Sequence, residues 1–307
     1  MSVYPATPRP VWRAVDGILL LDKPIGLSSN DALQRVRRAL SAKKAGHTGS
    51  LDPLASGLLP LCFGEATKVA GLLLDADKTY QATVALGTRT NTGDAEGSVV
   101  EEAPVPFLNA TLVERAMTSF MGMRTQIPPM FSALKRDGQP LYKLARRGIE
   151  VEREARPIRI DSLRLIGLSG SLLSFEVACS KGTYVRTLAE DLAVALGTVG
   201  HLVALRRTAL GRGFDGRVMH TLEAIEDAAR EPGRLESWLV AADVALVSWP
   251  SVTLDEFETR AFTQGQAVSL ACPAEARLRV YGPEERFLGL GQSDPMGLEV
   301  RPVRLWK

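Results

Sequence analysis

The sequence of 307 residues has few of the residues that build disulfide frameworks and metal centres. Its three cysteines, Cys62, Cys179 and Cys272, are far apart and lie among apolar residues, and there are only three histidines. Such wide spacing excludes a cysteine framework and shows no metal-ligand pattern. We therefore expect buried, reduced thiols and no metal.

The sequence also lacks an apolar run as long as a membrane span. Residues 1–16 are rich in Pro and Arg but have no apolar core followed by a small-residue cleavage site, so they do not form a signal peptide. These absences predict a cytoplasmic protein with no membrane association and a flexible N-terminal leader over residues 1–16. A hydrophobic content of 45% and a charged content of 23% are typical of globular proteins.

A strong excess of one charge is also missing, because the formal net charge is only +2. A nucleic-acid partner is better indicated by where basic residues cluster than by their sum. For any single cluster a solvated helix face is the simpler explanation, and only recurrence favours a polyanion. Three clusters occur: Arg35, Arg37, Arg38, Lys43 and Lys44; Lys135, Arg136, Lys143, Arg146 and Arg147; and Arg206, Arg207, Arg212 and Arg217.

Hydrophobic periodicity predicts strands and helices that are mixed without regular alternation. No phosphate-binding Gly loop follows the first strand, which argues against a doubly wound sheet. We expect an α+β fold with a mixed, largely antiparallel central sheet flanked by helices. The predicted strands are 17–22, 58–63, 79–87, 172–179 and 201–210; the predicted helices are 28–40, 65–74, 111–120 with a Thr111–Glu114 capping box, 183–196 and one from 221.

A change of composition near Trp249-Pro250 predicts a domain boundary. Beyond it, short candidate strands at 277–281, 286–290 and 298–305 are separated by Gly, Pro and Asp turns. The expected organisation is a catalytic domain over 17–249 and a small β-rich domain over 250–307.

Residues 46–60 form a Gly-dense segment that holds one carboxylate, Asp52, between apolar residues. Pro53 biases Asp52 away from helical backbone angles. Two interpretations follow: Asp52 caps a helix with Pro53 at its first position, or it is a rigidly held carboxylate that does chemistry. From this segment alone the cap is favoured. His47 is the one histidine inside the segment.

Two further places offer polar side chains suited to a site. Tyr80 starts a predicted strand, where it is either a core residue or a ring on which a base stacks. Tyr184 and Arg186 lie near the start of a predicted helix. Arg186 is either a surface residue or the partner of a carboxylate through two parallel hydrogen bonds.

Several motifs, in order along the chain, closely resemble those of the TruB family, the tRNA pseudouridine-55 synthases. The likeness covers about residues 17–207. The motifs are DKPIGLSS (22–29), GHTGSLDPLASG (46–57), LCFGEATK (61–68), DKTY (77–80) with LGTRTNTGDAEG (86–97), QIPPMFSALK (126–135) and CSKGTYVR (179–186). Asn91 and Phe131 depart from the frequent Asp and Tyr of the family, and neither touches the expected chemistry.

The resemblance implies a role for each candidate site residue. Asp52 matches the nucleophile that attacks the target uridine, Tyr80 the tyrosine that stacks on the flipped uracil and has been proposed as a base, and Arg186 the partner of the aspartate. Tyr184 and Leu205 match pocket residues, and His47 matches the histidine that contacts bases of the RNA loop. Lys23 and Pro24 match a motif with a structural role.

The resemblance also implies that an insertion around 124–150 folds over the RNA, carrying Lys135, Arg136, Lys143, Arg146 and Arg147. The C-terminal piece resembles a PUA domain, an RNA-binding module. Together these features imply an isomerase that converts the T-arm uridine at position 55 of tRNA, without a cofactor, as a monomer with no obligate protein partner.

Other possibilities stay open from the sequence alone. The carboxylate can add to C6 of uracil or trap ribose C1′, as glycosidases do. A protein that mainly refolds tRNA, with secondary catalysis, is an alternative function. A glycosidase, which would release free uracil, is another.

Overall fold

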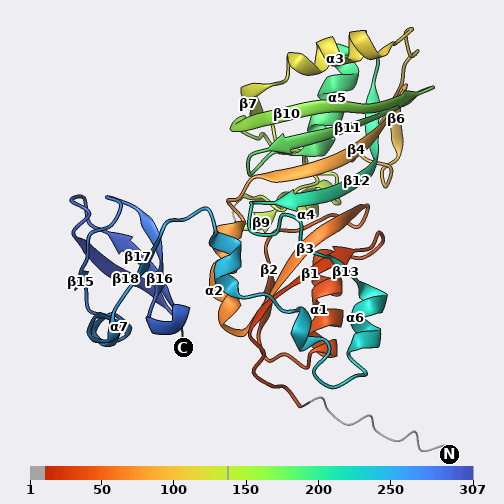
Figure 1. Ribbon diagram of the computed structural model, residues 1–307. Coiled ribbons are helices and arrows are strands. Elements are labelled where there is room, and N and C mark those ends of the chain that lie inside the picture. The colour runs from red at the N-terminus through yellow and green to blue at the C-terminus, as the bar shows by residue number, and fades with distance from the viewer. Residues whose placement is uncertain (1–10, 137, 307) are drawn as a thin grey trace, which may run out of the picture.

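A computed structural model describes residues 11–136 and 138–306, and their strands form a nine-stranded sheet, a five-stranded sheet and two small hairpins. In Figure 1 the nine-stranded sheet runs the length of the larger body, and the five-stranded sheet stands to one side, next to α2 (Thr67–Leu73). The large sheet has the strand order β13-β1-β3-β12-β4-β11-β10-β7, and β2 pairs with β3. Only β1 with β13 and β12 with β3 pair in parallel. The predicted α+β class with a mixed, largely antiparallel sheet is confirmed.

The elements follow the hydrophobic pattern of the sequence closely. The strands of the large sheet are β1 (Gly17–Lys23), β2 (Ala45–His47), β3 (Ala55–Phe63), β4 (Lys78–Leu86), β7 (Gly122–Gln126), β10 (Arg156–Ser169), β11 (Leu172–Cys179), β12 (Gly200–Leu210) and β13 (His220–Thr221). The hairpins are β5 (Thr88–Thr90) with β6 (Val99–Glu102), and β8 (Lys135–Arg136) with β9 (Gln139–Pro140). Besides α2, the helices of this part are α1 (Ser29–Ala39), α3 (Ala110–Thr118), α4 (Leu141–Ala145), α5 (Val185–Ala195) and α6 (Leu222–Ala228), with 3₁₀ turns η1 (Gly64–Ala66), η2 (Glu236–Trp238) and η3 (Ala242–Leu246).

One face of the large sheet is covered along its whole length. Helices α1, α3, α5 and α6 contribute Val36, Met117, Leu192 and Ile225 to a single core cluster with the strands. Side chains of successive strand residues point to opposite faces of a sheet. Every second residue of β4 and β11 is buried, and these residues form the covered face. On the opposite face α2 and η3 cover β1 and β3, whereas β4 and β11 present polar side chains.

The C-terminal sheet contains β14 (Ser251–Thr253), β15 (Val268–Ser269), β16 (Arg277–Tyr281), β17 (Phe287–Ser293) and β18 (Glu299–Leu305), with α7 (Glu256–Thr263) and η4 (Pro283–Glu285) beside it. It is anchored to the large body by polar and apolar contacts. Lys68 of α2 donates to the Leu305 carbonyl at 2.6 Å, and Tyr281 donates to Asp243 of η3 at 2.7 Å. Trp306 packs against the core beneath α2.

Some local predictions were wrong. Asn109, not Thr111, caps α3 by accepting from the Leu112 N–H at 3.0 Å, so the helix begins at Ala110. Of the predicted flexible leader, residues 1–10 lie outside the described residues. The part that is described is anchored: the Arg13 N–H donates to the Ser41 carbonyl at 2.8 Å, and Arg37 lies 4.5 Å from the Trp12 ring centroid.

The three thiols are free, as predicted. Burial raises the pKa of Cys62 to about 12 and that of Cys179 to about 11, so both stay protonated. Cys272, expected to be buried, is only half-buried. In the described part of the chain no helix is both long and apolar enough to cross a membrane.

Gly57 of β3 tests how closely the sheet is packed beside the site. Its φ is +98°, and a Cβ there would overlap the carbonyl oxygen of Arg207 on β12. We predict that Gly57→Ala lowers the free energy of unfolding by at least about 2 kcal/mol, through strain and loss of strand contact. Urea unfolding measures this difference.

Gly71 of α2 provides the matched control, since a Cβ at this position would meet no atom within 4 Å and its φ is not positive. Gly71→Ala should raise stability by up to about 1 kcal/mol, because Ala is the better helix former. Equal effects of the two substitutions would contradict the close β3–β12 contact.

Candidate active site

Asp52 lies in a β-turn directly before β3. The Ala55 N–H donates to the Asp52 carbonyl at 3.0 Å, and Pro53 occupies the second position of the turn, where its fixed φ fits. No helix begins here, so the capping interpretation is wrong. The Asp52 side chain is therefore free to face the cavity, and half of its surface is exposed.

The turn that carries Asp52 is tied to the segment after β1. The Ser29 hydroxyl accepts from the Leu51 N–H at 2.7 Å and lies 3.1 Å from its carbonyl oxygen. The buried Lys23 ammonium donates to the Ala55 carbonyl at 2.8 Å. Burial lowers the pKa of Lys23 to about 8, although the charge of Asp52 opposes the shift. These contacts agree with the structural role expected for Lys23.

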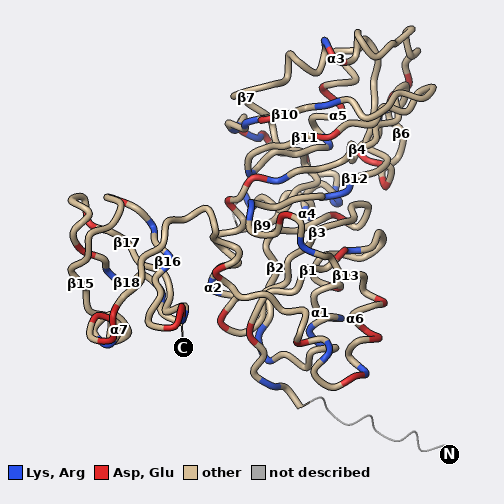
Figure 2. The backbone as a smooth tube through the Cα atoms, in the orientation of Figure 1, with Lys and Arg blue, Asp and Glu red and all other residues tan. Residues whose placement is uncertain are grey.

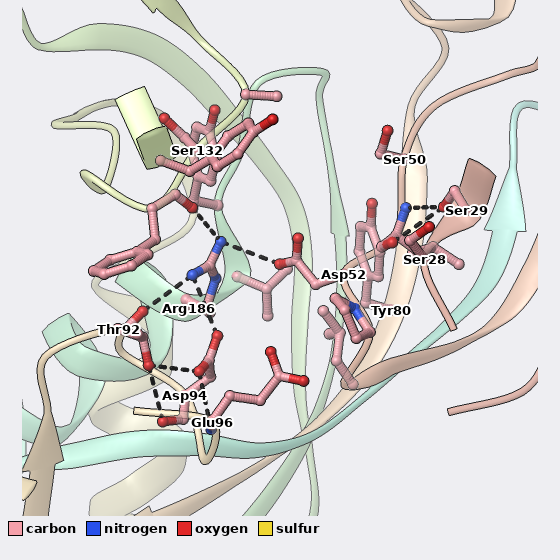
Figure 3. Close-up of a pocket in the computed structure, with 18 of the residues that line it drawn as sticks. Ser28, Ser29, Ser50, Asp52, Tyr80, Thr92, Asp94, Glu96, Ser132 and Arg186 are labelled. Atoms are coloured by element: carbon pink, nitrogen blue, oxygen red, sulfur yellow. Dashed lines mark hydrogen bonds and ion pairs between the residues drawn. The ribbon is translucent and has the colours of Figure 1, made fainter. Parts of the chain in front are cut away.

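Arg186 is the buried cation of the site. It is the second residue of α5, and its side chain is only 8% exposed, so the surface alternative is wrong. Figure 3 shows its guanidinium between two carboxylates, 3.1 Å from Asp52 Oδ2 and 3.2 Å from Asp94 Oδ2. It also donates to the carbonyls of Thr92 at 3.1 Å and Phe131 at 2.7 Å. These contacts fix the direction from which it meets Asp52.

Asp94 was present in a quoted motif but was given no role from the sequence. It is 3% exposed, accepts from the Thr92 hydroxyl at 2.6 Å and from the Glu96 N–H at 3.1 Å, and so holds its own turn while it faces Arg186. The signal available in the sequence for Asp94 was a carboxylate directly after Gly93. In the structure the φ of Gly93 is +74°, so the chain turns at this point. Glu96 also reaches the cavity, and burial together with the charges of Asp94 and Asp52 raises its pKa.

All six predicted site residues line one cavity of about 600 Å³. Tyr80 comes from β4, Leu205 from β12 and His47 from β2, while Tyr184 precedes α5. The six predicted residues in the cavity wall are His47, Asp52, Tyr80, Tyr184, Arg186 and Leu205. Residues from four separate stretches of the chain thus meet where β3, β4 and β12 adjoin.

Gln126 at the end of β7 is a second residue that sequence reasoning missed. Its side-chain amide donates to the Tyr184 carbonyl at 3.1 Å and accepts from the Tyr184 N–H at 2.8 Å. Gln126 is buried, so both ends of its amide need partners. This reciprocal pair explains why α5 begins at Val185, two residues later than predicted.

Two aromatic side chains of the cavity have shifted ionisation. Burial raises the pKa of Tyr80, against the opposing charge of Arg207. Burial also raises the pKa of Tyr184. Both phenols are therefore protonated at neutral pH and offer ring faces and hydroxyl groups to a ligand.

The predicted RNA-covering insertion borders the cavity. Phe131, Ser132, Tyr142 and Arg146 of this segment are among the lining residues. All five of its predicted RNA-binding side chains are exposed or partly exposed: Lys135, Arg136, Lys143, Arg146 and Arg147. Arg146 also lies 5.6 Å from the Tyr142 ring centroid.

The third basic cluster is divided between the interior and the surface. Arg207 is 1% exposed, and Arg206 makes two hydrogen bonds to Asp22, at 2.9 and 2.8 Å. Arg212 and Arg217 are exposed. Figure 2 shows basic and acidic residues interspersed along the backbone. Among the described residues, no group of His, Cys, Asp and Glu is placed to hold a metal ion.

Comparison with known proteins matches most of the chain to models of one family. Residues 37–185 match the model of the TruB family pseudouridylate synthase N-terminal domain. Residues 186–247 match the tRNA pseudouridylate synthase B C-terminal domain, and residues 250–306 match the C-terminal domain of pseudouridine synthase II TruB. The chain belongs to the TruB family.

TruB-family relatives resemble the chain over nearly its full length. The tRNA pseudouridine synthase B of Aromatoleum aromaticum is 52% identical over 95% of this chain and 93% of its own. That of Hydrogenovibrio crunogenus is 47% identical over 96% of this chain and 95% of its own, and that of Burkholderia lata 53% identical over 95% and 90%.

Solved structures show the pseudouridine synthase fold of this TruB-family chain. An H/ACA ribonucleoprotein bound to a substrate RNA containing 2′-deoxyuridine has a TM-score of 0.74 at 21% identity, over 95% of this chain and 85% of the other. A Cbf5-Nop10-Gar1 complex has a TM-score of 0.73 at 24% identity, over 99% and 91%. At this level of identity the likeness concerns the fold alone.

His47 gives a pH-dependent test of the site. Burial and the charge of Arg207 lower its pKa, and its Nδ1 is buried without a hydrogen-bond partner among the described residues. We predict that the imidazole titrates below pH 6.5 in an NMR titration, with the signal assigned by its loss in His47→Gln.

The sign for stability follows from the same shift. Because the unfolded chain binds this proton at a higher pH than the folded chain, His47 makes the free energy of unfolding fall as pH drops through 6.5. Titration at or above pH 6.5 would contradict the described environment of His47.

Proposed function

We propose that this TruB-family chain is a tRNA pseudouridine synthase that isomerises the T-arm uridine at position 55, with Asp52 as nucleophile. The observation that carries the proposal is the Asp52–Arg186 ion pair inside a cavity bounded by Tyr80, Tyr184 and Leu205. Family membership supports the reaction class, and relatives of about half identical sequence carry the name tRNA pseudouridine synthase B.

The geometry suits an attacking carboxylate. Arg186 contacts Asp52 from one side and leaves half of that side chain exposed to the cavity. A cation held at 3.1 Å fixes the direction of the carboxylate, which attack on either uracil C6 or ribose C1′ requires. Breaking the bond from C1′ to N1 and joining C1′ to C5 requires no redox or phosphate chemistry, so the proposal includes no cofactor.

The target base must leave a folded RNA loop to reach Asp52. Extruding a stacked base costs roughly a few kcal/mol, and stacking on an aromatic ring returns about 1–3 kcal/mol. Tyr80 provides such a ring in the wall of the cavity, which also includes Leu205. His47 lines the same cavity and would contact the bases around the vacated position.

We propose that residues 17–249 form the catalytic domain and residues 250–307 a PUA-like domain that contacts the rest of the tRNA. The insertion around 124–150 would cover the bound RNA, because it already contributes to the cavity wall. Since the six proposed site residues come from one chain, we propose that the protein acts as a monomer, without an obligate protein partner, in the cytoplasm.

Tritium release tests the nucleophile. With unmodified tRNA labelled at uridine C5, the wild-type protein should release the label, and Asp52→Asn should lower the rate by more than about 10⁴-fold because the attacking group is lost. Affinity for tRNA should stay within a few-fold, since the contacts of the covering segment are unchanged. Filter binding measures it.

Product analysis on the same samples separates the alternatives. Pseudouridine at position 55 supports the proposal, and free uracil would instead indicate a glycosidase. Label release that survives Asp52→Asn would remove Asp52 from the mechanism. Refolding of tRNA by the inactive variant would show that both activities reside in one protein.

The covering segment makes a second prediction, on salt dependence. Lys135 and Lys143 lie on this segment with solvent-accessible side chains. Replacing both by Gln should weaken tRNA binding and reduce the slope of log K against log salt by about 1.5, because each lost phosphate contact contributes roughly 0.7–0.9. Filter binding between low and moderate salt measures the slope.

The control removes two charges elsewhere. Arg230 and Arg234 are exposed beyond the end of α6, where each pairs with an acidic residue of its own turn. Their double replacement by Gln should leave the slope unchanged. Equal slopes for both double variants would contradict phosphate contact by the covering segment.

A further inference from the structure

Arg207 is a fully buried cation opposite Tyr80, one of the residues that line the cavity. Its side chain is 1% exposed, and none of the described carboxylates forms an ion pair with it. Nε donates to the Leu58 carbonyl at 2.7 Å, and one terminal nitrogen donates to the Gly49 carbonyl at 3.3 Å.

Keeping a charge in this position is costly. Removing an ion from water costs several kcal/mol, and an opposite charge normally offsets that cost. Two carbonyl oxygens accept hydrogen bonds from Arg207 but bring no full charge. An uncharged donor would fill the same space at a lower desolvation cost. The presence of a cation here therefore indicates a role in the neighbouring site.

The register of the sheet shows what Arg207 joins. On β12 it stands directly opposite Tyr80 of β4 on one side and Gly57 of β3 on the other. Gly49, its carbonyl partner, lies three residues before Asp52. Arg207 therefore lies beside the stacking ring and binds the segment that leads to the attacking carboxylate.

We propose that Arg207 is a positioning residue for the isomerisation, an inference that rests on the function proposed above: its buried positive charge, directly across the strands from Tyr80, favours the phenolate that accepts the proton leaving uracil C5. The Tyr80 hydroxyl first gives its proton to solvent. Once C1′ is bonded to C5, the phenolate takes the C5 proton, and the electron pair of the C5–H bond forms the C5=C6 double bond. In the same step C6 loses one bond: either the N1=C6 electron pair moves to N1, which takes a proton from solvent, or, after attack at C6, the bond from C6 to Asp52 breaks and the carboxylate is regenerated.

The charges around Tyr80 agree with this role. Burial, Cys179 on β11 and Asp52 all raise the pKa of the phenol, and Arg207 is the cation that opposes them. Negative charge that develops on the oxygen during proton transfer is stabilised by a fixed cationic donor in a water-poor site. Tyr184, the other cavity tyrosine, faces Ser132 instead.

The experiment compares Arg207→Gln, which keeps a donor but loses the charge, with Arg207→Lys, which keeps the charge but loses the fork. Single-turnover conversion is followed on tRNA with hydrogen or deuterium at uridine C5, beside tRNA binding and thermal melting. Arg164→Gln on β10, where Arg164 pairs with Glu176 at 2.8 Å on an exposed surface, is the matched control.

For Arg207→Gln we expect a rate about 100-fold lower than wild type, at unchanged tRNA affinity, because the proton acceptor loses the cation that stabilises its negative charge. Deuterium at C5 should slow this variant more than it slows the wild type, and Arg207→Lys should recover part of the rate. Arg164→Gln should match the wild type. In the Tyr80→Phe background, which lacks the oxygen, Arg207→Gln should cause no further loss.

Several results would overturn the inference. They are a rate for Arg207→Gln within about twofold of wild type, a loss with no added sensitivity to deuterium, and losses that multiply with Tyr80→Phe. If Arg207→Gln does not fold, the same criteria apply to Arg207→Lys. A wild-type protein that forms no pseudouridine would defeat the proposed function, whereas active wild type with equally active Arg207 variants defeats the inference alone.

Discussion

The site depends on one guanidinium shared between two carboxylates. Arg186 contacts Asp52 at 3.1 Å and Asp94 at 3.2 Å, and two backbone carbonyls take its remaining donors. Asp94 is buried while Asp52 is half exposed. Arg186 therefore pairs with one carboxylate in the interior and with a second one that a substrate can reach. A single lysine could not make this set of contacts, because it lacks the planar fork.

The fold supplies each partner of Arg186 from a different element. The turn before β3 presents Asp52, the loop after β5 presents Asp94, and α5 presents Arg186 near its N-terminus. Gln126 of β7 fixes the start of that helix through the backbone of Tyr184. Strand pairing in the middle of the sheet thus sets the separation of groups that are distant in sequence.

A second buried cation, Arg207, lies opposite Tyr80 across the strands and donates to the Gly49 carbonyl, in the segment that leads to Asp52. The two arginines have different surroundings. Arg186 has two carboxylates within ion-pair distance, whereas Arg207 donates to backbone carbonyls. One cation is thus paired with the attacking carboxylate and the other lies beside the stacking ring, which suits a reaction in which negative charge develops at both.

Much of the fold followed from local pattern. The strand predicted at 172–179 matches β11, and the helix predicted at 28–40 matches α1 to within one residue at each end, because both patterns are encoded in adjacent residues. The resemblance of the motifs predicted which residues belong to one site. Hydrophobic periodicity alone could not predict this. The helix cap at Asp52 was wrong because Pro53 suits the second position of a turn as well as the first of a helix.

What local pattern could not supply were contacts between distant segments. Asp94 looks like an ordinary turn residue, and Gln126 an ordinary polar strand end, until α5 is placed beside them. Arg207 looked like part of a basic surface because its neighbours in sequence are basic. Only the pairing of β12 between β3 and β4 shows that its side chain is buried.

The most direct test of the shared guanidinium is the single-turnover rate of pseudouridine formation at position 55 by Arg186→Lys, measured beside its tRNA affinity. The account predicts a rate at least about 100-fold below wild type with affinity unchanged, because the lysine cannot hold Asp52 and Asp94 together. A rate close to wild type would show that Asp52 needs only a nearby positive charge and would contradict the account.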